Sequence, residues 1–177
     1  MTRNENKQLS LGIDVGSTTV KVVLLEGEEI LYQEYQRHMS QVRQKTLELL
    51  QQAAPFIGDR PFTVALSGSA GLGLAESVGI PFVQEVFATG EVVKRLEPDT
   101  SAVIELGGED AKIIFFDGGM EERMNGSCAG GTGAFIDQMA TLLNVTVDEM
   151  DKLSLRHTRI YPIASRCGVF AKSDIQP

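Results

Sequence analysis

A repeated unit of two β-strands joined by an acidic, glycine-containing turn constrains the fold of this chain more than any other feature. Residues 13–27 and 104–118, which are 91 positions apart, agree at 11 of 15 positions when close substitutions are counted with identities. Four of the agreeing pairs carry the shared chemistry: Asp14 with Glu105, Gly16 with Gly107, Lys21 with Lys112 and Gly27 with Gly118. A long-period repeat of one supersecondary unit predicts two related lobes. The open alternative is that any two hairpins with acidic starts and glycine turns resemble each other.

The hydrophobic pattern around the repeat predicts an α/β fold. Strands are expected where short apolar or alternating runs are bounded by turn residues, at 9–15, 20–25, 30–35, 62–66, 80–83, 102–106 and 111–116. Helices are expected where apolar residues recur at helical spacing, at 41–54 (ended by Pro55), 72–78, 84–96, 134–143, 148–155 and 170–176. Residues 160–164 are expected to form a short strand or an extended segment.

This order of elements predicts one complete lobe over residues 1–100 and the start of a second lobe over residues 101–177. The last helix has no closing signal, so the chain is expected to be part of a longer protein.

The first hairpin turn contains groups that suit a phosphate ligand. Glycine lets the backbone approach a ligand closely, and a tight turn can present several N–H groups in one direction. Asp14, at the strand end, is a candidate for holding Mg²⁺ through water and for catalysis. The candidate nucleotide-binding residues here are Asp14, Gly16, Ser17, Thr18, Thr19 and Lys21. An ordinary hairpin turn would explain the glycine and the hydroxyls but not the acidic strand end.

The second hairpin repeats this chemistry. A polyphosphate and its metal are best gripped from two sides, with carboxylates for Mg²⁺ and for orienting water. Glu105 is the candidate catalytic carboxylate of this copy. Its candidate nucleotide-binding residues are Glu105, Gly107, Gly108, Glu109, Asp110 and Lys112. Neither turn matches the P-loop pattern, and a strand rather than a helix follows each turn, which excludes a dinucleotide-binding fingerprint.

The sequence resembles a known family at these hairpins and at two cysteine motifs. The hairpins are similar to the phosphate-1 and phosphate-2 motifs of the superfamily of sugar kinases, Hsp70, actin and acetate kinase. The stretches Asn125–Phe135 and Ser165–Asp174, which hold Cys128 and Cys167, resemble the activators of 2-hydroxyacyl-CoA dehydratases and the ATPase subunits of benzoyl-CoA reductases. The resemblance runs from about Leu11 to the end of the chain and implies an actin-like ATPase fold.

For that family, the resemblance implies a homodimer with one [4Fe–4S] cluster at the subunit interface, to which each chain gives the thiolates of Cys128 and Cys167. A four-iron cluster needs about four ligands, and one chain offers two. The family's cofactors would be ATP or ADP with Mg²⁺. Its partners would be a CoA-thioester dehydratase or reductase component and, as electron donor, reduced ferredoxin or flavodoxin. ATP binding would change the lobe angle, and one low-potential electron would pass to the partner.

The chain departs from the family's small activators at the second hairpin. Those proteins usually show Asp-Ile-Gly-Gly-Gln-Asp, whereas Glu105 adds a methylene and Glu109 adds a charge. The adenosine-binding segment is expected beyond Pro177, so the 177-residue stretch alone is expected to be inactive. These features resemble the activase-like region of large, multidomain relatives.

Two alternatives for the function and two for the cysteines stay open at this point. A sugar or small-molecule kinase would use the same hairpins without paired cysteines, and a regulatory domain would have a degenerate nucleotide site. The cysteines alone would also suit a Cys₄ zinc site split across a dimer, or buried structural thiols.

Composition narrows the function further. The net charge of −8, with scattered basic residues, argues against nucleic-acid or anionic-membrane binding. The polar N-terminus and the lack of a long apolar run predict a cytoplasmic protein. His38 and His157 are both expected at the surface, and the small-residue segment 67–73 is expected to be a loop near the cleft.

Overall fold

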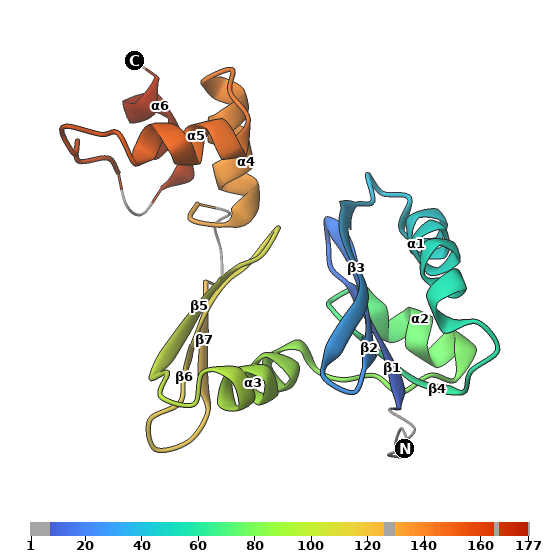
Figure 1. Ribbon diagram of the computed structural model, residues 1–177. Coiled ribbons are helices and arrows are strands. Elements are labelled where there is room, and N and C mark those ends of the chain that lie inside the picture. The colour runs from blue at the N-terminus through green and yellow to red at the C-terminus, as the bar shows by residue number, and fades with distance from the viewer. Residues whose placement is uncertain (1–7, 126–129, 165–166, 177) are drawn as a thin grey trace. The chain divides into compact units, whose positions relative to one another are not determined.

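The computed structural model describes residues 8–125, 130–164 and 167–176, and the chain divides into two compact units, residues 1–98 and 99–177. Figure 1 shows both units with their elements labelled. Within the described ranges, no helix is both long and apolar enough to cross a bilayer.

A four-stranded sheet forms the centre of the first unit. Its strands are β1 (Leu9–Val15), β2 (Thr19–Glu26), β3 (Glu29–Arg37) and β4 (Phe62–Ser67), and they lie in the order β3-β2-β1-β4. The first three strands form an antiparallel meander, whereas β4 runs parallel to β1. A parallel neighbour requires a crossover connection, which helix α1 (Val42–Ile57) provides.

Side-chain alternation along β1 builds the core of this unit. Leu9, Leu11, Ile13 and Val15 point to one face and are at most 5% exposed. Buried residues of α1 and of helix α2 (Gly71–Val78) complete the apolar cluster on that face, among them Leu49, Ala53, Ile57 and Ala75. Because strand side chains alternate, the intervening Asp14 points to the opposite face. Helix α3 (Glu85–Leu96) ends the unit.

Two details of the first unit differ from the sequence-based expectation. Pro55 does not end α1, which continues to Ile57, because the burial of Ile57 in the core stabilises the last turn. The missing proline N–H costs one hydrogen bond near the helix end, and Gly58, with φ of 59°, then terminates the helix. The expected strand at 80–83 is reduced to a single parallel bridge between Leu66 and Phe82.

In its described residues, the second unit combines a small sheet with three helices. Strands β5 (Ala102–Leu106), β6 (Ala111–Phe115) and β7 (Glu121–Met124) form an antiparallel meander in that order. Helix α4 (Gly133–Leu142) contacts α5 (Val147–Ser154) and α6 (Gly168–Ile175). Residues 160–164 have no regular structure. The buried apolar residues of the described part of this unit are Ile114, Met139, Ala140 and Ala171, so its core is smaller than that of the first unit.

Candidate functional site

The turn between β1 and β2 is closed by its own backbone and flanked by an ion pair. The Gly16 amide donates a hydrogen bond to the Thr19 carbonyl oxygen over 2.9 Å. Asp14 and Lys21 lie opposite each other in the antiparallel register, and Lys21 Nζ is 2.6 Å from Asp14 Oδ2. Ser17 and Thr18 are half-buried at the turn, whereas Thr19 is buried. The first hairpin thus brings an acid, a lysine and a glycine turn together.

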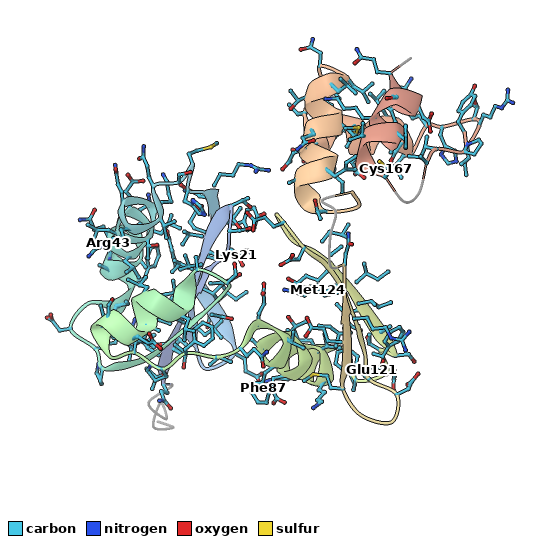
Figure 2. All side chains as sticks on the ribbon, turned by 180° about the vertical axis from the view of Figure 1, so that it is seen from behind. Lys21, Arg43, Phe87, Glu121, Met124 and Cys167 are labelled. Carbon is cyan, nitrogen blue, oxygen red and sulfur yellow. The ribbon has the colours of Figure 1, made fainter. Side chains whose placement is uncertain are left out.

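Lys21 keeps its positive charge in this setting. Partial burial lowers the pKa of its ammonium group, but the hydrogen bond from Lys21 to Asp14 and the attraction of that carboxylate outweigh the effect. The net result is a pKa raised above the ordinary value of 10.5. Lys21 Nζ also lies 5.5 Å from the centre of the Tyr35 ring (Figure 2 labels Lys21). A charged ammonium at this turn would attract a phosphate group.

A glycine-rich segment packs directly on the acidic residue. Gly68 has φ of 91°, and a Cβ atom built on it would lie 2.3 Å from Asp14 Oδ1 and 2.4 Å from the Val15 carbonyl oxygen. The Ala70 amide donates to that same Val15 oxygen. Asp14 Oδ1 is buried and has no hydrogen-bond partner among the described residues. The segment predicted only to lie near the site therefore contacts the carboxylate itself.

His38 is buried below the same turn, so the prediction of a surface histidine is wrong at this position. It is 5% exposed, its ring Nε2 is 3.2 Å from the Gly16 carbonyl oxygen, and its backbone amide donates to the Thr18 oxygen. A histidine that follows a strand and precedes a helix carries no sequence signal for burial, because the contact depends on how β3 returns to the turn. His157 is exposed, as expected.

The turn between β5 and β6 repeats two features of the first hairpin: the closing backbone hydrogen bond and the acid–lysine pair. The Gly107 amide donates to the Asp110 oxygen over 2.8 Å, and Glu105 lies opposite Lys112 in the register. Lys112 Nζ is 3.7 Å from Glu105 Oε1, and the Lys112 side chain is only 10% exposed. Gly108 is half-buried within the turn and Glu109 is exposed. Each of these positions equals a first-hairpin position plus 91, so the sequence repeat is also a repeat of the closing backbone hydrogen bond and of the acid–lysine ion pair.

The second hairpin is fastened to the start of helix α4. The Gly133 amide donates to the Gly107 oxygen over 2.8 Å, and a Cβ on Gly133 would lie 3.0 Å from the Leu106 oxygen. Thr132 is fully buried and caps α4 by accepting a hydrogen bond from the Phe135 amide. Thr132 lies within the stretch Asn125–Phe135 that contains the first cysteine motif, so the cap links this motif to α4.

The cysteine motifs meet in the second unit as far as the structure describes them. Cys128 lies outside the described residues. Cys167 is a half-buried free thiol that directly precedes helix α6 (labelled in Figure 2). A Cβ on the next residue, Gly168, would lie 3.3 Å from the Gly130 Cα atom. Gly130 is two residues from Cys128 in the sequence, so the two motifs are neighbours in space. The described residues contain no cluster of three or more potential metal ligands.

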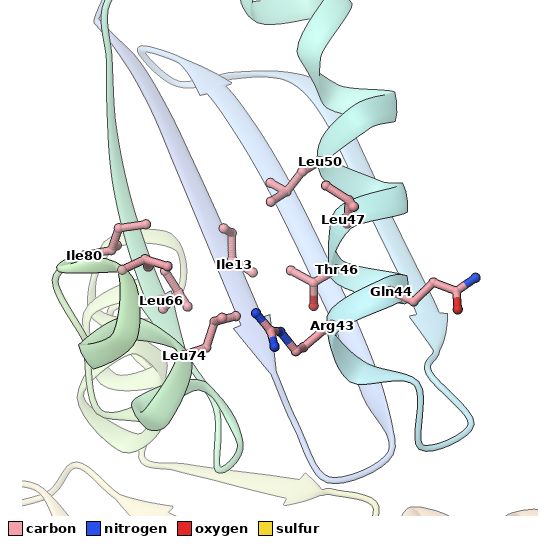
Figure 3. A pocket seen from close by; sticks show the side chains of 10 residues that line it. Ile13, Arg43, Gln44, Thr46, Leu47, Leu50, Leu66, Leu74 and Ile80 are labelled. Carbon is pink, nitrogen blue, oxygen red and sulfur yellow. The ribbon is translucent and has the colours of Figure 1, made fainter.

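An apolar groove of the first unit is separate from this polar site. Its volume is about 550 Å³, and Figure 3 shows it between α1 and α2, over the face of the sheet that carries Ile13. Its lining includes Leu47, Leu50, Leu66 and Leu74. Asp14 points to the other face, so this groove does not contain the acidic site.

Comparisons with known proteins agree with this architecture. The model of the BadF/BadG/BcrA/BcrD ATPase family matches residues 11–176. The chain is 33% identical over 172 residues to the (R)-2-hydroxyglutaryl-CoA dehydratase activating ATPase of Acidaminococcus fermentans, covering 94% of this chain and 65% of that protein. It is also 33% identical to the activator of lactoyl-CoA dehydratase from Anaerotignum propionicum, covering 94% of this chain and 66% of that protein.

A solved structure shows the same fold. The activator of the 2-hydroxyisocaproyl-CoA dehydratase from Clostridium difficile, with bound ADPNP, is 29% identical, with a TM-score of 0.80 over 94% of this chain and 64% of that one. The fold and the paired hairpins define an actin-like ATPase domain, as the sequence predicts. The chain belongs to the BadF/BadG/BcrA/BcrD ATPase family and spans about two-thirds of the length of these relatives.

Proposed function

We propose that the two hairpins bind the phosphates of ATP or ADP with Mg²⁺, and that the protein is an ATP-dependent activator. The observation that carries the proposal is the repeat of the same closing hydrogen bond and the same acid–lysine pair in both hairpins. A single turn of this kind occurs in many hairpins, whereas two matched turns suit a ligand gripped from both sides. The relative solved with ADPNP supports the nucleotide.

Each residue of the turns has a proposed role. Lys21 would leave Asp14 to neutralise phosphate charge, and the carboxylate set free would hold Mg²⁺ through a water molecule. The open hydrogen-bonding capacity of Asp14 Oδ1 fits such a water. Glu105, with Glu109 and Asp110 in the same turn, would orient the attacking water. The remaining candidates, Gly16, Ser17, Thr18, Thr19, Gly107, Gly108 and Lys112, would line the phosphates.

Calorimetry of the full-length protein with Mg-ADPNP tests the nucleotide site. Lys21→Met removes the phosphate-binding charge and is expected to weaken binding about tenfold or more, as for other charge-assisted contacts. Lys45→Met is the matched control, because Lys45 pairs with Glu48 on helix α1 and lies outside the turn. Equal affinity of both variants, or no binding by the parent protein, would contradict the proposal.

We further propose that Cys128 and Cys167 supply two thiolates to a [4Fe–4S] cluster shared by two copies of the chain. The contact between Gly130 and Gly168 supports it, because it joins the two motifs. Cys167 directly precedes a helix, where the first amides and the helix dipole favour a thiolate. When bound, the cluster would supply one electron at low potential.

Anaerobic reconstitution tests the cluster site. The parent protein is expected to show an absorbance shoulder at about 400 nm and to sediment as a dimer. The Cys167→Ala variant is expected to lose both the shoulder and the dimer. A Cys167→Ala variant that keeps the full shoulder would rule out this ligand. Tightly bound zinc without iron would favour the split zinc site instead.

The names of the relatives suggest the partner. Activators of CoA dehydratases and a subunit of benzoyl-CoA reductase are among them. We therefore propose a CoA-thioester dehydratase or reductase component as electron acceptor and reduced ferredoxin or flavodoxin as donor. Partner activity that depends on ATP and is lost in Cys128→Ala would support this role, whereas full activity in that variant would favour a kinase-type function.

A further inference from the structure

His38 contacts the first hairpin through both its ring and its backbone amide. It follows the last residue of β3, and its ring lies beneath the turn with Nε2 3.2 Å from the Gly16 oxygen. The Ser40 amide donates to Nδ1 over 3.1 Å. A nitrogen that accepts a hydrogen bond from an N–H carries no proton, so Nδ1 is the bare nitrogen and Nε2 carries the hydrogen. Nε2 therefore donates to the Gly16 carbonyl oxygen.

This bond fixes the direction of the next amide in the turn. A trans peptide group is planar, and its C=O and N–H point in opposite directions. Holding the Gly16 oxygen against the His38 ring therefore turns the Ser17 N–H away from the ring. In the described part of the chain, the amides of Ser17 and Thr18 donate to no other group. The His38 backbone amide donates to the Thr18 oxygen and so holds the following peptide group, between Thr18 and Thr19.

We propose that His38 is a positioning residue that sets the plane of the Gly16–Ser17 peptide in the β1–β2 turn, so that the Ser17 amide faces a phosphate group. The inference rests on the proposed nucleotide site. His38 touches no phosphate itself, and it acts through the Gly16–Ser17 peptide. Its effect is therefore specific to the phosphate-bearing part of a ligand, which separates a positioning role from a purely structural one.

Replacing His38 by glutamine or by asparagine distinguishes the roles of its two ring nitrogens. In His38→Gln, the side-chain NH₂ occupies the region of Nε2 and retains a donor for the Gly16 oxygen. In His38→Asn, the shorter amide occupies the region of Nδ1 and loses that donor, while the backbone bond to the Thr18 oxygen remains. In the full-length protein, His38→Asn is expected to weaken Mg-ADPNP binding about tenfold, the loss typical of one well-placed buried hydrogen bond. His38→Gln is expected to stay within about threefold of the parent, and adenosine binding is expected to be unchanged in both.

The outcomes are distinguishable. If the parent protein does not bind Mg-ADPNP, the nucleotide site fails and the role of His38 falls with it. If the parent binds but His38→Asn binds equally well, or loses adenosine and Mg-ADPNP alike, only the role of His38 is overturned. Should His38→Asn not fold, ¹⁵N NMR of the parent protein decides the question: the Nε2–H form together with a Ser17 amide signal that shifts on adding Mg-ADPNP supports the proposal. A protonated Nδ1, or an unmoved Ser17 signal, overturns it.

Discussion

Single residues at the first hairpin show how closely the backbone is packed around the acidic group. Gly68 combines a positive φ with a contact that leaves no room for a Cβ atom next to Asp14. Both conditions favour glycine. For other residues this backbone conformation costs about 1–3 kcal/mol of stability, and a steric clash would increase that cost. The sequence marks this segment only by its small residues, because the partner atom comes from another strand.

Gly68→Ala is therefore expected to lower the free energy of unfolding by about 2–4 kcal/mol, from strain together with the clash against Asp14. Gly73→Ala is the control, because a Cβ atom built on Gly73 would meet no neighbouring group within 4 Å and the residue occupies helix α2. That variant is expected to be neutral or stabilising by about 0.5–1 kcal/mol. Denaturant unfolding would measure both, and a similar loss in the two variants would contradict the packing described for Gly68.

Helix α5 shows what one element's cap contributes. Thr146 Oγ1 accepts a hydrogen bond from the Glu149 amide, and Glu149 Oε2 accepts one from the Thr146 amide. These two bonds form a capping box, which satisfies amides that the helix start leaves open. The bonds from the Thr146 backbone and hydroxyl to the carboxylate lower the pKa of Glu149 below its ordinary value of 4.5.

Because the pKa of Glu149 is lowered, the stabilisation by its ionised carboxylate is present above pH 4.5. It disappears as the pH falls through the pKa that Glu149 has in the folded protein. Glu149→Gln is therefore expected to flatten the loss of thermal stability between neutral pH and acid, as measured by circular dichroism at several pH values. Thr146→Ala removes the hydroxyl that accepts the hydrogen bond from the Glu149 amide, and this hydroxyl does not titrate. The variant is therefore expected to lower the free energy of unfolding at every pH, by about 1 kcal/mol. A Glu149→Gln variant with the parent's pH slope would contradict the assignment.

Much of the element order could be predicted from the sequence, since periodicity and turn residues are local signals. The meander 9–35, the hairpin 102–115 and most helices lie within a few residues of their expected positions. Three of the failures are of one physical kind. Pro55 stays helical because Ile57 is buried by the sheet, residues 80–83 form only a bridge, and His38 is buried by a turn 20 residues earlier. Each depends on tertiary contacts that local patterns do not contain.

At the scale of the whole molecule, the two units have separate apolar cores. The main core cluster comes entirely from residues of the first unit, among them the fully buried Leu49. The second unit leaves several large apolar side chains exposed, among them Ile104, Leu155, Ile160 and Val169. Exposed apolar surface of this kind suits contact with another chain or segment.

Separate cores predict separate responses to a core mutation. Leu49→Ala is expected to destabilise the first unit by about 2–5 kcal/mol, because it leaves a cavity in a packed interior. Hydrogen exchange followed by mass spectrometry should show faster exchange across β1–β4 and α1, with unchanged exchange in β5–β7. Faster exchange spread evenly over both units would show that they unfold together.

The bond between the Gly133 amide and the Gly107 oxygen joins the second hairpin to helix α4 through main-chain atoms alone. Most substitutions change side chains only, so substitutions at neighbouring positions would leave this main-chain hydrogen bond intact. The acids of the turn, or the residues around the cysteines, could therefore change during evolution while the bond between the hairpin and the helix is kept. At the two glycines themselves, an added Cβ atom would lie 3.0–3.1 Å from a backbone oxygen, so replacements there would strain this connection.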